Sequence, residues 1–295
     1  MTWHFTEDPA VFRAAAGALL SAEPARNTGL LTLVDTAGRL GWWTGPDGRV
    51  TGVLVVAAPG ETTFGTVTPE AARALASSPD LPGNGGPAVV RGEAAAVEAF
   101  AQATGRPWTP TVRMRLFRLG TLTPPDPAPA GRARVATTAD VPLAAAWARE
   151  FVRDIGEEPG TDYTGPVTER ISDGRLLIWE EGDRDGGDRE GSDREGGDGE
   201  GGDREGGGGR PVSMACFSPV TEGQSRVHFV YTPPAARGRG YAAGVAAAAS
   251  RAAREAGAAQ VLLFTDLANP TSNALYRRLG YRPVTDHLTA EVTGR

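Results

Sequence analysis

Residues 227–257 most constrain what this chain can fold into. They start with a β-branched and aromatic run that predicts a strand ending at Tyr231. Pro233 and Pro234 prevent the strand from continuing, because proline lacks an amide donor and has a fixed φ. The Ala-rich residues that follow predict about four turns of helix ending at Gly257, a residue type common just beyond helix C-termini. We therefore expect a strand, a loop and a helix N-terminus, in that order.

The loop before this helix, Arg237-Gly238-Arg239-Gly240, predicts an anion-binding site. The first amides of a helix have no acceptor within the helix, and the helix dipole is positive at that end. Glycines also allow phosphate oxygens to approach the backbone closely. The loop lacks both the Lys-Ser/Thr of a P-loop and the spacing G-x-G-x-x-G, so its residues exclude two common nucleotide motifs.

Two segments of the chain resemble motifs of the GCN5-related N-acetyltransferases (GNAT family). Arg237-x-x-Gly240-x-Ala242 resembles the pyrophosphate-binding motif R/Q-x-x-G-x-G/A. After a second predicted strand at 260–265, residues 269–281 resemble the second cofactor segment, N-x-x-S/A-x-x-x-Y-x-x-x-G-F/Y, in the expected order and at the expected distance. The chain is thus identified as similar to a bacterial two-domain member of this family.

The resemblance implies the GNAT fold of the α/β (α+β) class, a mixed central sheet flanked by helices with a splayed strand pair at the cofactor site. Strand and helix signals also alternate in residues 1–122, which we interpret as a degenerate acetyltransferase-like domain because they contain no R-x-x-G-x-G/A equivalent. Residues 123–131 contain four prolines and predict a stiff linker. Residues 132–295 are then the expected catalytic GNAT domain. The expected N-terminal strands are 27–34, 49–57, 88–90 and 113–119, and the helices are 9–20, 68–77 and 93–104.

The expected catalytic domain contains a low-complexity insertion at 181–210. This tract has eleven acidic residues and five arginines, a net charge of −6 that equals the formal charge of the whole chain. Its Asp/Arg/Glu/Gly repeats at 183–207 contain no apolar residue, so we expect disorder. The insertion separates predicted strands at 175–180 and 211–217, which form one hairpin. We also expect a short first strand and a capped turn within 134–140, helices at 141–155 and 163–172, and a strand pair after Gly280.

Composition excludes several classes of function. Outside the acidic tract the charges balance, so nothing indicates a nucleic-acid surface. No apolar run is long enough to span a membrane, and the first residues lack a signal-peptide pattern, so we expect a cytoplasmic protein. Cys216 is the single cysteine, which excludes an internal disulfide and indicates a structural thiol in a core strand. No metal site is expected.

The resemblance implies acetyl-CoA as the co-substrate and assigns roles to several residues. The diphosphate would lie on the amides of residues 238–243, with the pantetheine arm along the free edge of residues 229–231. Tyr276 matches the tyrosine that protonates the departing thiolate. Asn269 and Asn273 suit both helix capping and pantetheine binding. The expected cofactor-binding residues are Phe229, Val230, Tyr231, Arg237, Gly238, Arg239, Gly240, Tyr241, Ala242, Ala243, Asn269, Asn273 and Tyr276.

The general base and the acceptor stay open at this point. His228 can move a proton near neutral pH but also suits a structural role. Asp154 comes first among the acidic residues at the end of the first helix of the catalytic domain, a group that includes Glu150, Glu157 and Glu158. We expect an N-acetyltransferase acting by direct attack of a small-molecule or peptide amine on acetyl-CoA. The alternatives are a non-catalytic acyl-CoA-binding or regulatory protein and a tandem enzyme resembling mycothiol synthase, and a homodimer is also open.

Overall fold

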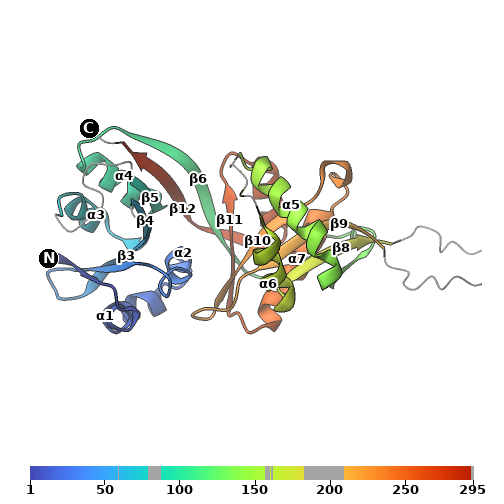
Figure 1. The fold of residues 1–295 in the computed structure, drawn as a ribbon, viewed down its shortest axis with the longest axis horizontal. Helices are drawn as coiled ribbons and strands as arrows, with labels where there is room; N and C mark the ends of the chain where they lie inside the picture. Colours follow the sequence, from blue (N-terminus) through green and yellow to red (C-terminus); the bar gives the residue numbers. More distant parts are fainter. Residues whose placement is uncertain (59, 79–87, 157–159, 161, 183–208, 294–295) are drawn as a thin grey trace, which may run out of the picture. The chain divides into compact units, whose positions relative to one another are not determined.

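The computed structural model describes residues 1–58, 60–78, 88–156, 160, 162–182 and 209–293 (Figure 1). The chain divides into two compact units. Unit 1 contains residues 1–122, 219–226 and 253–295, and unit 2 contains residues 123–218 and 227–252. Unit 2 begins at residue 123, where the predicted linker begins. Residues 132–295 do not form one unit, however, because 219–226 and 253–295 belong to unit 1. The last strands of the chain hydrogen-bond to strands of the N-terminal part, which is why they belong to unit 1.

Unit 1 is built on a mixed sheet with strand order β1-β2-β3-β4-β5-β12-β6-β11, followed by the first residues of β10. Its helices are α1 (Pro9–Ala22), α2 (Thr28–Leu31), α3 (Pro69–Ala76), α4 (Ala94–Ala103) and α8 (Pro270–Arg278). Its strands are β1 (Thr2–Thr6), β2 (Arg39–Thr44), β3 (Val50–Ala58), β4 (Glu61–Val67), β5 (Ala88–Glu93), β6 (Trp108–Leu119), β11 (Gln260–Asp266) and β12 (Tyr281–Val292).

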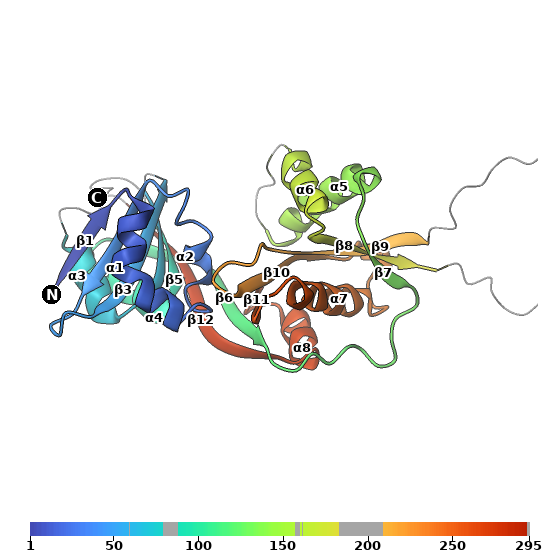
Figure 2. The same cartoon turned by 90° about the horizontal axis from the view of Figure 1, so that it is seen from below.

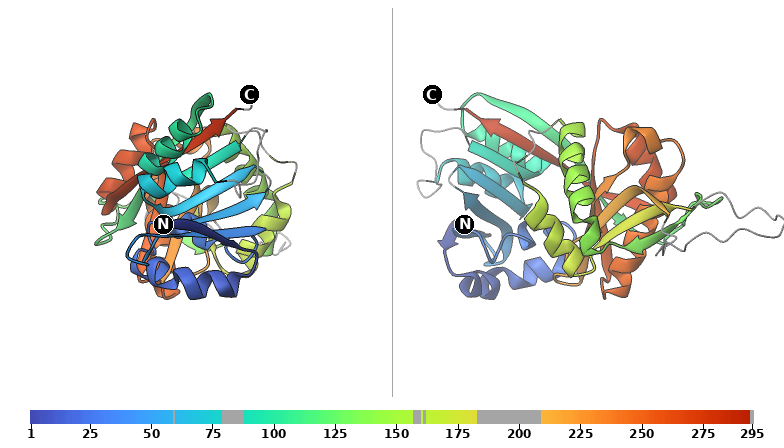
Figure 3. Two further views of the ribbon diagram at one scale, coloured as in Figure 1. Left: turned by 90° about the vertical axis from the view of Figure 1, so that its left-hand side faces the viewer. Right: turned by 45° about the vertical axis from the view of Figure 1, so that its right-hand side comes forward.

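Helices cover both faces of the N-terminal sheet of unit 1, as Figure 3 shows on either side of the blue strands. Alternate residues of β3 enter two different cores, as the two-residue period of a strand requires. Val53 and Val55 pack with Phe12 of α1 on one face. Leu54 packs with α3 and α4 residues, including Leu75, on the other face. The continuous apolar run of β3 follows from this double coverage.

Unit 2 contains an antiparallel sheet of β7 (Arg132–Val135), β8 (Leu176–Glu181), β9 (Arg210–Phe217) and the residues of β10 (Gln224–Tyr231) that follow Arg226. The helices α5 (Val141–Asp154) and α6 (Thr164–Ser172) lie on one face, and α7 (Tyr241–Glu255) lies on the other (Figure 2). Gly244 explains the close approach of α7, because a Cβ there would lie 2.8 Å from the Trp179 ring of β8.

Most of the predicted elements form, including the β8–β9 hairpin. The strand expected at 27–34 is wrong, because Leu31 N donates to Asn27 O and begins the short helix α2 instead. The strand pair expected after Gly280 is also wrong, because β12 is one strand of twelve residues. Three strands, β1, β2 and β4, were not predicted.

The repeats at 183–207 lie outside the described residues, while Glu181 and Arg210, on either side of residues 183–208, form an ion pair of 2.6 Å. Among the described helices, none has the length and apolar character needed to cross a membrane.

Candidate active site

The turn from β10 into α7 has the geometry expected of an anion site. After Tyr231, the short 3-10 turn Pro234–Ala236 leads into the loop, and α7 begins at Tyr241. Gly238 and Gly240 have φ values of +78° and +82°, a backbone region that favours glycine over every L-residue. The first amide that bonds back into the turn is that of Gly244, which donates to Gly240 O at 3.1 Å.

The amides of residues 238–243 therefore form a continuous row of available donors. Within the described part of the chain, no backbone or side-chain acceptor is recorded for any of them. Unpaired donors at a helix N-terminus favour anions, both by hydrogen bonding and through the helix dipole. The predicted donors are in place, and the binding of a diphosphate to them stays a prediction.

Carboxylates already engage both arginines of this loop. Arg237 pairs with Asp154 at the end of α5, and its Nε donates to Thr232 O at 2.9 Å. Arg239 lies 3.4 Å from Glu181 at the end of β8. The loop is thus tied to α5 and to β8 before any anion arrives.

Glu181 contacts the loop and the start of α7, and the sequence analysis did not identify it. The Tyr241 hydroxyl donates to its carboxylate, and Arg210 pairs with the same group. These two contacts, the Tyr241 bond first, lower the pKa of Glu181 to about 2. Its place at the end of a mainly apolar strand, shortly before the repeats, was the available signal.

The strand β10 carries a bulge at the predicted pantetheine edge. Its parallel pairing with β11 covers Gln224, Ser225 and Arg226. The register with β9 then shifts between His228 and Tyr231. Phe229 has φ +48°, which is unusual for a residue other than glycine, and its ring lies 5.2 Å from that of Phe151. A bulge of this kind removes backbone groups from the ladder and presents them to a ligand.

The candidate bases of unit 2 differ in what they contact. Asp154 is held by Arg237. Glu150, one turn earlier on α5, accepts a 2.8 Å hydrogen bond from the Tyr231 hydroxyl. Burial and then Glu150 raise the pKa of Tyr231 to about 12. His228 is half-buried opposite Cys216, with its ring edge against Phe229. Glu157 and Glu158 lie outside the described residues.

The second predicted cofactor segment forms the start of α8 in unit 1. Asn269 caps the helix by accepting from Ser272 N at 3.0 Å. Asn273 donates to Asp266 O and Asn269 O at 2.8 and 2.7 Å and accepts from Thr265 at 3.0 Å. Asn269 is thus the helix cap, and Asn273 ties α8 to the end of β11.

Tyr276, the predicted proton donor, is a buried residue of α8. Its ring packs edge-on against Tyr281 with centroids 5.9 Å apart. Burial raises the pKa of its phenol above the usual value of tyrosine. Among the described residues, its hydroxyl has no recorded hydrogen-bond partner. The side chain is therefore protonated at neutral pH and has a hydroxyl that the local packing does not use.

Two further expectations concern chemistry elsewhere in the chain. Cys216 is buried in β9, and burial raises the pKa of its thiol to about 12, which confirms a structural thiol. The described residues contain no group of three or more His, Cys, Asp or Glu side chains arranged to hold a metal ion.

Comparison with known proteins shows similarity to one family. Residues 168–281 match the family model described as the Acetyltransferase (GNAT) family. A GNAT-family acetyltransferase structure from Colwellia psychrerythraea is similar with a TM-score of 0.57 and 11% identity, covering 100% of both chains. A GCN5-related N-acetyltransferase from Sphaerobacter thermophilus has a TM-score of 0.59 and 15% identity over 99% of this chain and 95% of its own.

A third similar structure is a GCN5-related N-acetyltransferase from Kribbella flavida, with a TM-score of 0.55 and 18% identity over 94% of this chain and 96% of its own. No curated protein matches the chain. At these identities the structures show a shared fold, which extends over the N-terminal residues that the family model leaves uncovered. Residues 168–281 therefore contain a segment that matches the GNAT acetyltransferase family, and the chain has the GNAT fold.

Proposed function

We propose that this protein is an N-acetyltransferase that moves an acetyl or other acyl group from acetyl-CoA to an amine by direct attack in a ternary complex. The observation that carries the proposal is the row of unpaired amides at residues 238–243, held by two left-handed glycines at the N-terminus of α7. The match of residues 168–281 to an acetyltransferase family supports the same activity.

In this proposal the diphosphate of acetyl-CoA is bound by those amides. Arg237 and Arg239 would then exchange part of their contact with Asp154 and Glu181 for the phosphates, because guanidinium groups bind both anions well. The bulged backbone at Phe229 and Val230 would pair with the amides of the pantetheine arm as an added strand does. A backbone N–H near Val230 would stabilise the oxyanion.

The proton transfers are assigned to Tyr276 and to a base in unit 2. Acetyl-CoA supplies the reactive thioester, and Tyr276 would donate its phenolic proton to the departing thiolate, which its raised pKa allows over the neutral range. Arg237 already engages Asp154, so we assign the general base to His228 in this proposal. The proton of the attacking amine would then leave through His228.

The experiment is a thiol-release assay with acetyl-CoA across a panel of small amines and peptide N-termini. We expect release with at least one amine by the wild type, and strongly reduced release by Tyr276→Phe. Binding of coenzyme A is measured separately by calorimetry, so that loss of binding is distinguished from loss of chemistry.

A second candidate is a non-catalytic acyl-CoA-binding protein of the same fold. The observation favouring it is that β10, the strand before the loop, contains no Asp or Glu that could act as a base, while Arg237 engages Asp154. Tight coenzyme A binding without release for any amine would support this candidate and contradict the enzyme.

A further inference from the structure

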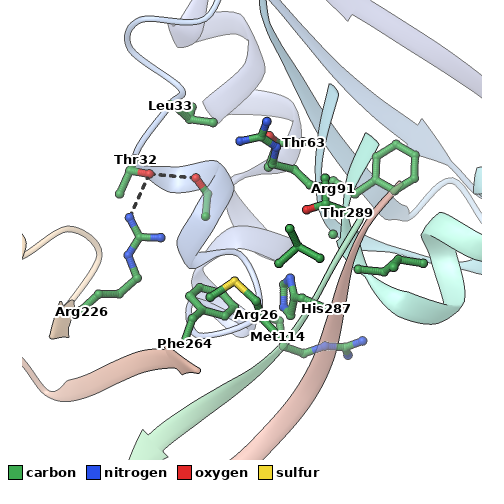
Figure 4. Close-up of a pocket in the computed structure, with 15 residues that line it drawn as sticks. Arg26, Thr32, Leu33, Thr63, Arg91, Met114, Arg226, Phe264, His287 and Thr289 are labelled. Carbon is green, nitrogen blue, oxygen red and sulfur yellow. Dashed lines mark hydrogen bonds between the residues drawn. The ribbon is translucent and has the colours of Figure 1, made fainter. Parts of the chain in front are cut away.

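Unit 1 contains a cavity of about 290 Å³ to which nothing above assigns a role. Side chains from the α2 region and from β4, β5, β6, β10, β11 and β12 line it (Figure 4). Its volume is at the lower end of the roughly 300–1,000 Å³ of small-molecule pockets. The cavity therefore suits a small organic molecule rather than a polymer.

The lining of the cavity is basic. Its titratable side chains are Arg26, Arg91, Arg226 and His287, and none of its lining residues is acidic. Arg26 and Arg91 pair with Glu93 and Glu61, which lie outside the lining. An anion entering the cavity would meet guanidinium groups and no lining carboxylate.

Among the arginines of the lining, Arg226 is the one whose guanidinium an anionic ligand would stabilise most, because burial disfavours its charge. Its side chain reaches from β10 toward the α2 region, where Nη2 donates to Thr32 Oγ1 at 3.3 Å (Figure 4). Burial lowers the pKa of its guanidinium, so the charged form is disfavoured by its surroundings. A carboxylate beside it would stabilise that form, and the planar guanidinium matches the geometry of a carboxylate.

His287 provides an independent sign of a ligand. Its Nε2 is buried and has no hydrogen-bond partner in the described part of the chain. Burial lowers its pKa to about 4, so the ring is neutral at pH 7. Its edge-on contact with Phe264, with centroids 4.9 Å apart, fixes the ring beside Met114 at the cavity (Figure 4). Buried polar atoms without partners are rare, and each calls for an explanation.

The rest of the lining combines the threonines Thr32, Thr63 and Thr289 with apolar side chains, including Phe64, Met114, Phe264 and Leu288. We propose that this cavity binds a small organic carboxylate with an apolar body. Arg226 and Arg91 would hold the carboxylate, His287 Nε2 would hydrogen-bond a polar group of the ligand, and the body would pack against Met114 and Phe264. The site does not require that the protein be an acetyltransferase.

Calorimetry on the full chain without coenzyme A tests the proposal with three probes: 3-phenylpropanoate, its neutral amide and inorganic phosphate. We expect the carboxylate to bind, the amide to bind at least about tenfold more weakly, and phosphate not to compete with the carboxylate. The imidazole nitrogen signals of His287 in NMR should shift with the carboxylate.

Three variants and a control locate the binding. Arg226→Met keeps an unbranched apolar stem but lacks the guanidinium, and His287→Phe keeps a ring against Phe264 but lacks the imidazole nitrogens. Arg91 is exposed, so we expect Arg91→Gln to fold. This variant keeps the test possible if Arg226→Met does not fold. Arg118→Gln, on the same strand as Met114 but outside the lining, is the control. We expect each cavity variant to weaken binding of the carboxylate by about tenfold or more and the control to leave it unchanged.

Three outcomes would overturn the proposal. They are equal affinity for carboxylate and amide, the absence of binding by all three probes, and unchanged binding in His287→Phe and Arg91→Gln.

Discussion

Arg237 forms an ion pair with Asp154, which joins the phosphate-binding arginine expected from the sequence to the carboxylate suggested as a general base. The two side chains are 50% and 44% exposed, so the pair contributes little to stability, about 0–1 kcal/mol. Its consequence is positional, because it orients Arg237 at the loop and engages Asp154 in the structure without a ligand.

Substituting the two candidate bases separates their roles. We expect Asp154→Asn to change kcat less than about threefold and to leave the affinity for coenzyme A unchanged or higher, since it releases Arg237. His228→Gln should lower kcat by about a hundredfold, the usual scale for a general base. Steady-state kinetics with a reactive amine measure both effects. The reverse pattern would assign the proton transfer to Asp154.

A charge introduced at Ala242 tests the anion site without disturbing the fold. Ala242 is the second residue of α7, where an acidic side chain interacts favourably with the helix dipole. We expect Ala242→Glu to fold with unchanged or slightly higher stability and to bind coenzyme A at least about tenfold more weakly, because it repels the diphosphate. The neutral variant Ala242→Gln is the matched control. Equal affinities of the two variants would mean that no anion binds there.

Tyr276→Phe tests the proposed proton donor. Because no partner of its hydroxyl is recorded in the described residues, its removal should change the free energy of unfolding by less than about 1 kcal/mol. We expect kcat to fall roughly 10²–10⁴-fold while the Kd of coenzyme A changes little. Calorimetry and thiol-release kinetics on the same preparation measure the two quantities. A variant with wild-type kcat would leave Tyr276 as a packing residue.

Asp140 predicts a pH dependence of the stability of unit 2. Arg134 binds this buried carboxylate through two hydrogen bonds of 2.7 and 2.8 Å, and this contact is the main reason that the pKa of Asp140 is about 2. Because the pKa of Asp140 is lower in the folded state, its ionised form stabilises the fold at pH values above the unfolded-state pKa, which is near 4. This stabilisation is lost as the pH falls through about 2.

We therefore expect Asp140→Asn to lower the free energy of unfolding by about 2 kcal/mol at pH 7 and by progressively less as the pH approaches 2. Urea unfolding followed by NMR signals of unit 2 provides the measurement. Asp126→Asn, at an exposed position in the same unit, is the control. A loss for Asp140→Asn that stays constant with pH would contradict the assignment of the shift to Arg134.

The features that could be predicted from the sequence are those that nearby glycines and prolines determine. The turn from β10 to α7 is of this kind, because two prolines end the strand and two glycines adopt the left-handed region. The strand β4 was missed because it buries Thr62 and Thr63, which do not form an apolar pattern. The helix α2 was taken for a strand because a short apolar run fits either period.

Features made by residues far apart in the sequence were beyond prediction. The membership of β12 in unit 1 depends on its pairing with β5 and β6, which no local pattern encodes. The basic cavity likewise brings Arg26, Arg91, Arg226 and His287 together from four separate segments. The contact of Arg237 with Asp154 depends on how α5 packs over the sheet of unit 2.

The most direct test of the account is an NMR titration of the backbone amides with coenzyme A and, separately, with pantetheine, which lacks the diphosphate. We predict large shifts of the amide signals of residues 238–243 with coenzyme A and small ones with pantetheine, because these donors have no other acceptor in the described structure. If coenzyme A binds and these six signals stay unmoved, the central claim is contradicted.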